Sequence, residues 1–243
     1  MRFHGLYYIP NQGAQLAASQ DMAKQIVSGI EARFPRADAA GAWTLNHRIL
    51  RDVPPYSENP QAAYDHAYQH LLHVSTLSPD RTYNLIQHKA SSAMTSIPLS
   101  QTDAHFSFLA NQMPLLWAPQ RVLDVPNGKI YQAGDFVIGV GELRSRRQAS
   151  AGTHTSPGLI ICISTHAGGP DSEAEGSSSP TEDGDVDFEY AQESIRELWS
   201  AITKDVTFNR SDARPFMQPT QDSRLEPREQ VVRMWCVALS PKA

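Results

Sequence analysis

Apolar side chains recur along this chain with two periods, one helical and one typical of strands. Residues 16–34 and 188–202 each place apolar side chains three and four positions apart, on one face of an amphipathic helix. Residues 43–49 alternate apolar and polar positions, as a half-buried strand does, and residues 3–9 are rich in aromatic and β-branched side chains. The pattern therefore predicts a sheet covered by two long helices.

Turn-forming sequences divide other strand-like segments into hairpins. Residues 78–81 (Ser-Pro-Asp-Arg) favour a type I turn between the apolar stretch 71–77 and residues 82–87. Residues 126–128 (Pro-Asn-Gly) favour a second hairpin turn, and residues 94–97 form a further short strand. Repeated hairpins predict an antiparallel sheet.

The segment after residue 97 begins with the signals of a short helix. Ser100 and Asp103 have the spacing of a capping box, with Thr102 as a rival N-cap. Apolar side chains then recur at helical spacing until Pro114 ends the helix, because proline lacks a backbone donor. A strand follows beyond Gly134.

The strand after Gly134 has two distinct faces. Its apolar side chains, expected to face the core, are Phe136, Ile138 and Val140. The opposite face carries Val137, Gly139, Gly141 and Leu143. Asp135 and Glu142 are expected to remain in solvent.

The order of these elements predicts the fold class. Residues 159–164 indicate a buried strand and residues 231–239 a last strand, which could meet the N-terminal strand to close a barrel. No linker divides the chain centrally, so we expect a single domain spanning residues 1–243. The prediction is an α+β fold, with an antiparallel β-barrel-like sheet flanked by amphipathic helices.

The negative charge of the chain is concentrated in one segment. Residues 167–187 hold seven acidic and no basic side chains, whereas the rest of the chain holds 21 basic and 19 acidic ones. This segment has little to bury and is expected to be a disordered acidic loop. A net charge of -5 gives no electrostatic reason to expect direct DNA binding.

The longest apolar run, residues 159–163, is too short to span a membrane, so we expect a soluble, intracellular protein.

Candidate chemical groups do not form a convergent set in the sequence. Cys162 and Cys236 lie within apolar runs, as inert buried thiols do. His66, His70 and His73 have a helical spacing that could suit zinc, but no cysteine pair accompanies them, so a surface or hairpin position is favoured. We therefore predict no enzyme, and no catalytic, cofactor-binding or metal-binding residue.

Several short motifs, taken in order, resemble one known family. They are Trp43-Thr-Leu-Asn-His-Arg, Ile97-Pro-Leu-Ser-Gln-Thr-Asp103, Leu116-Trp117, Gly128-Lys-Ile-Tyr131 and Gly134-Asp-Phe136 running to Gly141-Glu-Leu-Arg144. This ordered set resembles subunit 20 of the Mediator complex in its filamentous-fungal form, over about residues 1–165 and 186–239. The acidic insert goes beyond the family's pattern.

The resemblance implies a fold related to the TATA-binding protein and a non-enzymatic role in the nucleus. It implies a subunit of the Mediator head module that pairs with subunit 18, is tethered by a helix from the C-terminus of subunit 8, and acts as a coregulator of RNA polymerase II. It implies no cofactor. Contacts with other head-module subunits and with the polymerase would be indirect.

Two questions follow for the structure. We expect Val137, Leu143 and Arg144 to contribute to the partner interface. The alternative function is a β-barrel that binds a small ligand, or an enzyme built inside such a barrel. A ligand site needs a cavity with a few polar groups, whereas a scaffold would fill the lumen with Phe136, Ile138, Val140 and Trp235.

Overall fold

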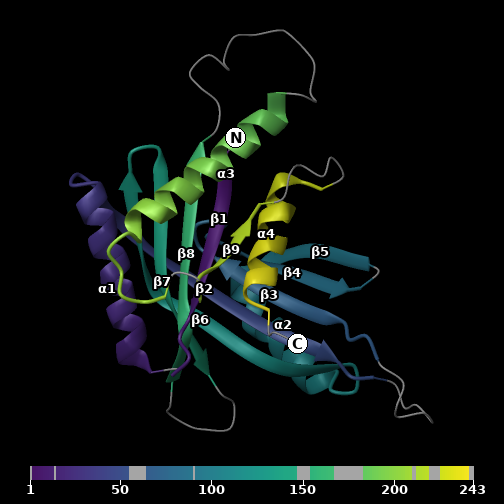
Figure 1. The fold of residues 1–243 in the computed structure, drawn as a ribbon. Helices are drawn as coiled ribbons and strands as arrows, with labels where there is room; N and C mark the ends of the chain where they lie inside the picture. Colours follow the sequence, from purple (N-terminus) through teal and green to yellow (C-terminus); the bar gives the residue numbers. More distant parts are fainter. Residues whose placement is uncertain are drawn as a thin grey trace. The chain divides into compact units, whose positions relative to one another are not determined.

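The strands of the described chain form an open antiparallel sheet (Figure 1). This computed structural model describes residues 2–13, 15–54, 64–89, 91–146, 154–166, 183–209, 212–218 and 225–240. The strand order is β5-β4-β3-β2-β6-β7-β8-β1-β9. The predicted α+β fold and antiparallel sheet are confirmed. The expected barrel closure is wrong, because β5 and β9 end the order without pairing to each other.

The strands have the following bounds: β1 Arg2–Pro10, β2 Asp38–Asp52, β3 Tyr68–Val74, β4 Arg81–His88, β5 Ser91–Pro98, β6 Trp117–Ala133, β7 Phe136–Arg146, β8 His154–His166 and β9 Arg214–Met217.

The chain forms two compact units. The first comprises Met1–Ala42, Asn127–Leu143 and Ser156–Ala238, and the second comprises Trp43–Pro126, Arg144–Thr155 and Leu239–Ala243. A single domain stays a prediction.

In the first unit, helices α1 (Leu16–Arg33) and α3 (Asp183–Ile202) enclose the main core with the strands. Both helices confirm the predicted amphipathic segments. Tyr7 of β1 stacks on Trp199 of α3, with ring centroids 4.1 Å apart. The buried members of this core are Tyr7, Ile9, Ile26, Ile30, Tyr131, Ala133, Ile138, Val140, Leu159, Ile161, Ile163, Ile195, Leu198, Trp199 and Ile202.

The segment expected to form the last strand is instead helix α4 (Pro227–Ala238). Pro227 occupies the first helical position, where its missing N–H costs nothing. Arg233 Nε donates to Glu229 Oε1 at 3.0 Å, one turn earlier. A short apolar run, here interrupted only by Arg233, fits a buried helix as well as a strand, and seven of the helix's twelve residues are buried. Helix α4 contacts β1 and β9.

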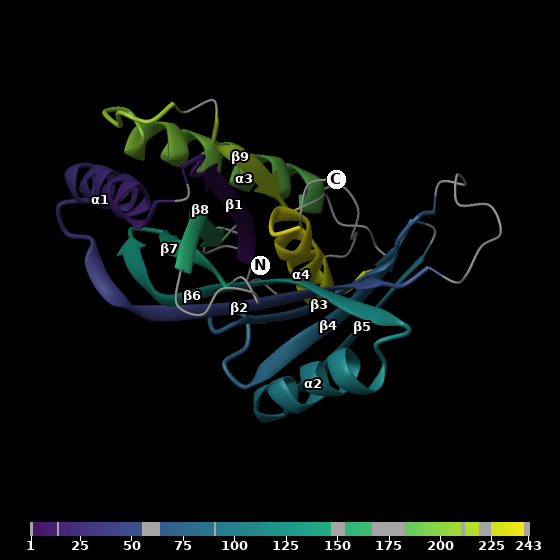
Figure 2. The ribbon, with the colours of Figure 1, turned by 90° about the horizontal axis from the view of Figure 1, so that it is seen from below.

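In the second unit, β2 to β5 form successive antiparallel pairs that α2 (Thr102–Gln112) crosses (Figure 2). The predicted hairpin of residues 71–87 is confirmed. Thr102 and Thr82 share a hydrogen bond of 2.6 Å, and the Arg48 guanidinium lies 5.0 Å from the Phe106 ring centroid. The expected capping box is wrong: α2 begins after Gln101 without a side-chain cap, and Asp103 pairs with Arg48.

The hairpin expected at residues 126–128 is also wrong, because β6 runs through them unbroken. The turn comes at Gly134, whose φ of +62° favours glycine, whereas Gly128 lies within the strand. Beyond this turn, the inward face of β7 is as predicted: Ile138 and Val140 are buried in the core and Phe136 packs against it. Glu142 is not fully solvated, since it is half-buried and accepts a hydrogen bond from Ser19 Oγ.

The predicted acidic loop falls largely outside the described residues, which exclude 167–182. Its last five residues, 183–187, were wrongly placed, because α3 begins at Asp183. No helix in the described ranges has an apolar stretch long enough to cross a membrane.

Candidate functional site

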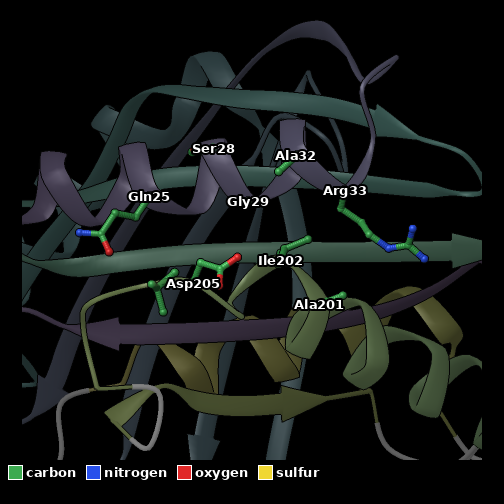
Figure 3. A pocket seen from close by; sticks show the side chains of 9 residues that line it. Gln25, Ser28, Gly29, Ala32, Arg33, Ala201, Ile202 and Asp205 are labelled. Atoms are coloured by element: carbon green, nitrogen blue, oxygen red, sulfur yellow. The ribbon is translucent and has the colours of Figure 1, made fainter.

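A groove lies between α1 and the C-terminal end of α3 in the first unit (Figure 3). Its volume is about 300 Å³, and it is lined by Gln25, Ser28, Gly29, Ala32, Arg33, Ala201, Ile202, Asp205 and Val206. Gln25 Oε1 accepts hydrogen bonds from the backbone N–H and the hydroxyl of Thr207, at 2.7 and 3.0 Å. Small side chains let the two helices approach closely, so this groove follows from helix packing.

Gly29 marks the closest approach of these helices and gives a stability prediction. A Cβ at this position would lie 1.9 Å from the backbone carbonyl oxygen of Ile202. Gly29→Ala should therefore cost about 1–3 kcal/mol through overpacking, which exceeds the gain in helix propensity of about 1 kcal/mol. Urea unfolding would measure the loss, with Ser28→Ala in the same helix as the control. A Gly29→Ala variant more stable than the wild type would contradict the close contact.

A second groove lies on the other side of α1, against β6 and β7 of the same unit. It has a volume of about 360 Å³ and is lined by Gln20, Ala23, Lys24, Val27, Ser28, Glu31, Asn127, Lys129, Val140 and Glu142. The charged side chains of its lining are two lysines and two glutamates. Because these charges balance, the groove offers no electrostatic preference for an anionic or a cationic ligand. The sequence pattern did not predict either groove, although the small residues Ser28, Gly29 and Ala32 could have indicated a close helix contact.

The structure places the three predicted interface residues in different environments. Val137 is half-buried, on the face of β7 opposite to Ile138. Leu143 is fully buried, so its side chain is not available to a partner in this conformation. Arg144 is half-buried.

Four large apolar side chains of the second unit are exposed on α2, just beyond its C-terminal end, and just past the end of β2. We call Val53, Phe108, Leu115 and Leu116 the α2 apolar cluster. Leu115 is 84% exposed, and Phe108 and Leu116 are about half exposed. The backbone N–H of Val53 donates to the carbonyl of Leu116 at 2.9 Å, which joins the end of β2 to this cluster. Several exposed large apolar side chains on neighbouring segments are typical of protein-binding surfaces.

The histidines of the sequence motif do not converge. His70 and His73 lie on β3, three residues apart, so their side chains project from opposite faces. Their ring nitrogens contact different partners: His66 contacts Asp52 at 2.8 Å, His70 contacts His47 at 3.1 Å, and His73 contacts the carbonyl of Arg81 at 2.9 Å. The favoured interpretation, a hairpin position for His70 and His73, is therefore confirmed.

The two thiols are not activated nucleophiles. Cys162 and Cys236 form no disulfide bond. Burial raises the pKa of the Cys162 thiol to about 12 and also raises that of the Cys236 thiol. The thiolate is the species that attacks a substrate or binds a metal, and a thiol with a raised pKa stays protonated at neutral pH.

Comparison with known proteins identifies a family. The sequence profile of the TATA-binding related factor of subunit 20 of the Mediator complex matches residues 6–234. No curated protein matches the sequence. Similar solved structures include the PH1819 protein from Pyrococcus horikoshii OT3, with 10% identity over 83% of this chain and 90% of that chain, and a TM-score of 0.38. The Schizosaccharomyces pombe Mediator head module gives 10% identity over 84% of this chain and 95% of that chain, with a TM-score of 0.38. Likenesses this distant add nothing to the profile match. Because that match spans nearly the whole sequence, this chain belongs to the family of Mediator subunit 20.

Proposed function

We propose that this chain acts in the nucleus as a non-enzymatic subunit of the Mediator head module, where it pairs with subunit 18 and the C-terminal helix of subunit 8 tethers the pair. Family membership supports a role in Mediator and in transcription. The raised pKa values of the Cys162 and Cys236 thiols support a binding role rather than nucleophilic catalysis.

The observation that carries this proposal is the α2 apolar cluster. Leu115 alone leaves 84% of its surface in water, and a large apolar side chain contributes about 1.5–3 kcal/mol when it is fully buried. Burial of three or four such side chains by a partner is enough to anchor an interface, because few residues supply most of its binding energy. The cluster is therefore a surface that a protein partner of this chain would cover.

Co-expression with subunit 18 and the C-terminal helix of subunit 8 tests this proposal. The wild-type chain is expected to co-purify with both. A Leu115→Asp/Leu116→Asp double variant should fold but bind at least tenfold more weakly, because two carboxylates would replace apolar contacts. Tyr190→Asp is the matched control, since Tyr190 is 73% exposed on α3 and lies outside the cluster. Failure of the wild type to co-purify would refute the pairing, whereas unchanged binding by the double variant would move the interface elsewhere.

The alternative of a ligand-binding barrel finds less support. The sheet is open rather than closed around a lumen. Ile138 and Val140 lie in a packed core, and Trp235 belongs to helix α4 instead of a lumen-facing strand. The observed arrangement therefore favours a packed scaffold.

A further inference from the structure

Strand β5 ends the sheet of the described residues, and its own sequence and register carry none of the usual edge protections. Its sequence, Ser91–Pro98 (SSAMTSIP), holds no charged residue, and six of its eight residues are exposed. Its register with β4 runs unbroken from His88↔Ser91 to Arg81↔Pro98, so no bulge interrupts it. Natural sheets guard their edges with charges, internal prolines, bulges or very short strands. The opposite edge does so, because β9 has four residues and includes Pro215.

The register shows which backbone groups of β5 point away from the sheet. Leu99 lies opposite Asp80, one position beyond the last strand pair, and its N–H donates to the Asp80 carbonyl at 2.8 Å. Hydrogen-bonded pairs alternate with non-hydrogen-bonded pairs along an antiparallel ladder. Ile97, Thr95 and Ala93 therefore bond to β4, whereas the N–H and C=O groups of Met94 and Ser96 point outward.

A second contact independently supports this assignment of inward and outward backbone groups. Arg81 pairs with Pro98 at a non-hydrogen-bonded position, so its carbonyl should point away from β5 and toward β3. His73 of β3 does contact this carbonyl, with 2.9 Å between Nδ1 and the oxygen. Among the residues that the structure describes, no strand pairs with the outward side of β5.

The side chains beside this edge indicate which kind of strand it would accept. Ile86 of β4 lies opposite Ala93, whose small side chain leaves Ile86 37% exposed. Ile97 lies on the same face as Ala93, four residues further along β5. An added strand with apolar side chains at alternate positions would cover Ile86 and Ile97. A charged segment would gain no partner from β5 itself.

We propose that β5 receives an extended, uncharged segment of subunit 18 as an additional strand, hydrogen-bonded to the outward groups of Met94 and Ser96. This inference rests on the proposed pairing with subunit 18 and specifies how that pairing is made. Main-chain hydrogen bonds would supply affinity, and the alternate apolar side chains over Ile86 and Ile97 would supply specificity.

Amide hydrogen exchange, read residue by residue, tests the strand addition directly. In the isolated full-length chain, the Met94 and Ser96 amides should exchange rapidly, while the inward Thr95 and Ile97 amides are protected. Addition of purified subunit 18 should slow exchange at Met94 and Ser96 at least tenfold. Unchanged exchange at these two amides in the complex would overturn the proposal. Protection that rises with the concentration of the isolated chain would assign β5 to a second copy instead, and would equally overturn it.

Proline substitutions in β5 provide a second, independent test of the strand addition. Met94→Pro and Ser96→Pro each remove one outward N–H, and proline is tolerated in an edge strand where the N–H faces solvent. Each should weaken binding to subunit 18 at least tenfold, whereas Met94→Leu and Ser96→Ala should bind like the wild type. Thr95→Pro removes an inward N–H that bonds to β4, so it should lower the melting temperature. This result would check which amides of β5 point inward.

The outcomes separate this inference from the proposed function. Wild-type pairing combined with normal binding by both outward proline variants would overturn strand addition and leave the pairing intact. Failure of the wild-type chain to bind subunit 18 would overturn both. If the proline variants do not fold, the exchange measurement on the wild-type chain still decides.

Discussion

Replacing Ile138 with aspartate is expected to unfold the chain or make it aggregate. The Ile138 side chain is fully buried in the core that α1 and α3 form with the strands, so Ile138→Asp would bury a carboxylate. Transfer of an unpaired ionised group into an apolar core costs at least several kcal/mol, and whole domains are stable by only about 5–15 kcal/mol. Circular dichroism should show the loss of structure directly.

The neighbouring residue supplies a matched control for this variant. Val137 is half-buried on the other face of β7, so a carboxylate at position 137 can stay hydrated. Val137→Asp should remain folded, and if this face meets subunit 18, it should weaken co-purification. A folded Ile138→Asp together with an unfolded Val137→Asp would invert the assignment of the two faces.

Lowering the pH from 7 to 5 is expected to destabilise the chain strongly, by a route that does not involve carboxylates. Burial is the main cause that lowers the pKa values of His4 and His70 to about 4, and it lowers that of His47 well below the ordinary value of 6.5. The charge of Arg2 also lowers the pKa of His4. His70 lowers the pKa of His47, and the charge of Arg121 lowers the pKa of both. All three imidazoles are therefore neutral in the folded chain at pH 5.

The sign of the effect follows from proton binding by the unfolded chain. Its histidines protonate as the pH falls through about 6.5, whereas in the folded chain His4 and His70 take up protons only near pH 4, and His47 only well below pH 6.5. The unfolded state is therefore favoured increasingly between these two values. With a folded-state pKa of about 4, His4 and His70 should each cost about 2 kcal/mol by pH 5, and the lowered pKa of His47 adds to this loss.

Urea unfolding at a series of pH values measures this loss. The slope of unfolding free energy against pH should reveal an uptake approaching three protons on unfolding near pH 5. Hydrogen bonds from Tyr64 and His66 lower the pKa of Asp52, so its contribution is lost below this window and does not confuse the result. An unfolding free energy that stays constant between pH 7 and 5 would show that these histidines can be protonated in the folded state.

Local patterns predicted the elements whose side chains are buried on one face. Helices α1 and α3, strand β1 and the β3–β4 hairpin all follow from a clear period and an unambiguous end signal. Helix α4 was mistaken for a strand because most of its residues are buried and its apolar side chains cover most of its circumference, which weakens the helical period in the sequence. The turn expected at residues 126–128 was wrong because neighbouring strands hold Pro126 and Gly128 in an extended conformation, which local sequence does not reveal.

The candidate interaction surfaces depend still more on tertiary structure. Alternation placed Val137 and Leu143 on the same face of β7, but it could not show that other elements bury Leu143 completely. The exposed side chains of the α2 apolar cluster come from segments separated in sequence. The pairing of β2 with β6 and the backbone bond between Val53 and Leu116 bring the ends of two of these segments together. Similarly, β5 becomes an edge only through the strand order, since its own sequence resembles that of an ordinary short strand.

The position of β1 between β8 and β9 has a consequence for synthesis on the ribosome. Leu6 pairs with Cys162, which is added 156 residues later, and Tyr7 pairs with Pro215, which is added later still. At roughly 5–20 residues per second, about 10–30 seconds pass between the synthesis of β1 and that of β8, the first of its two partner strands to be made. Throughout that interval the nascent chain exposes Leu6, Tyr7 and Ile9, all buried in the finished protein, to any chaperone that meets it.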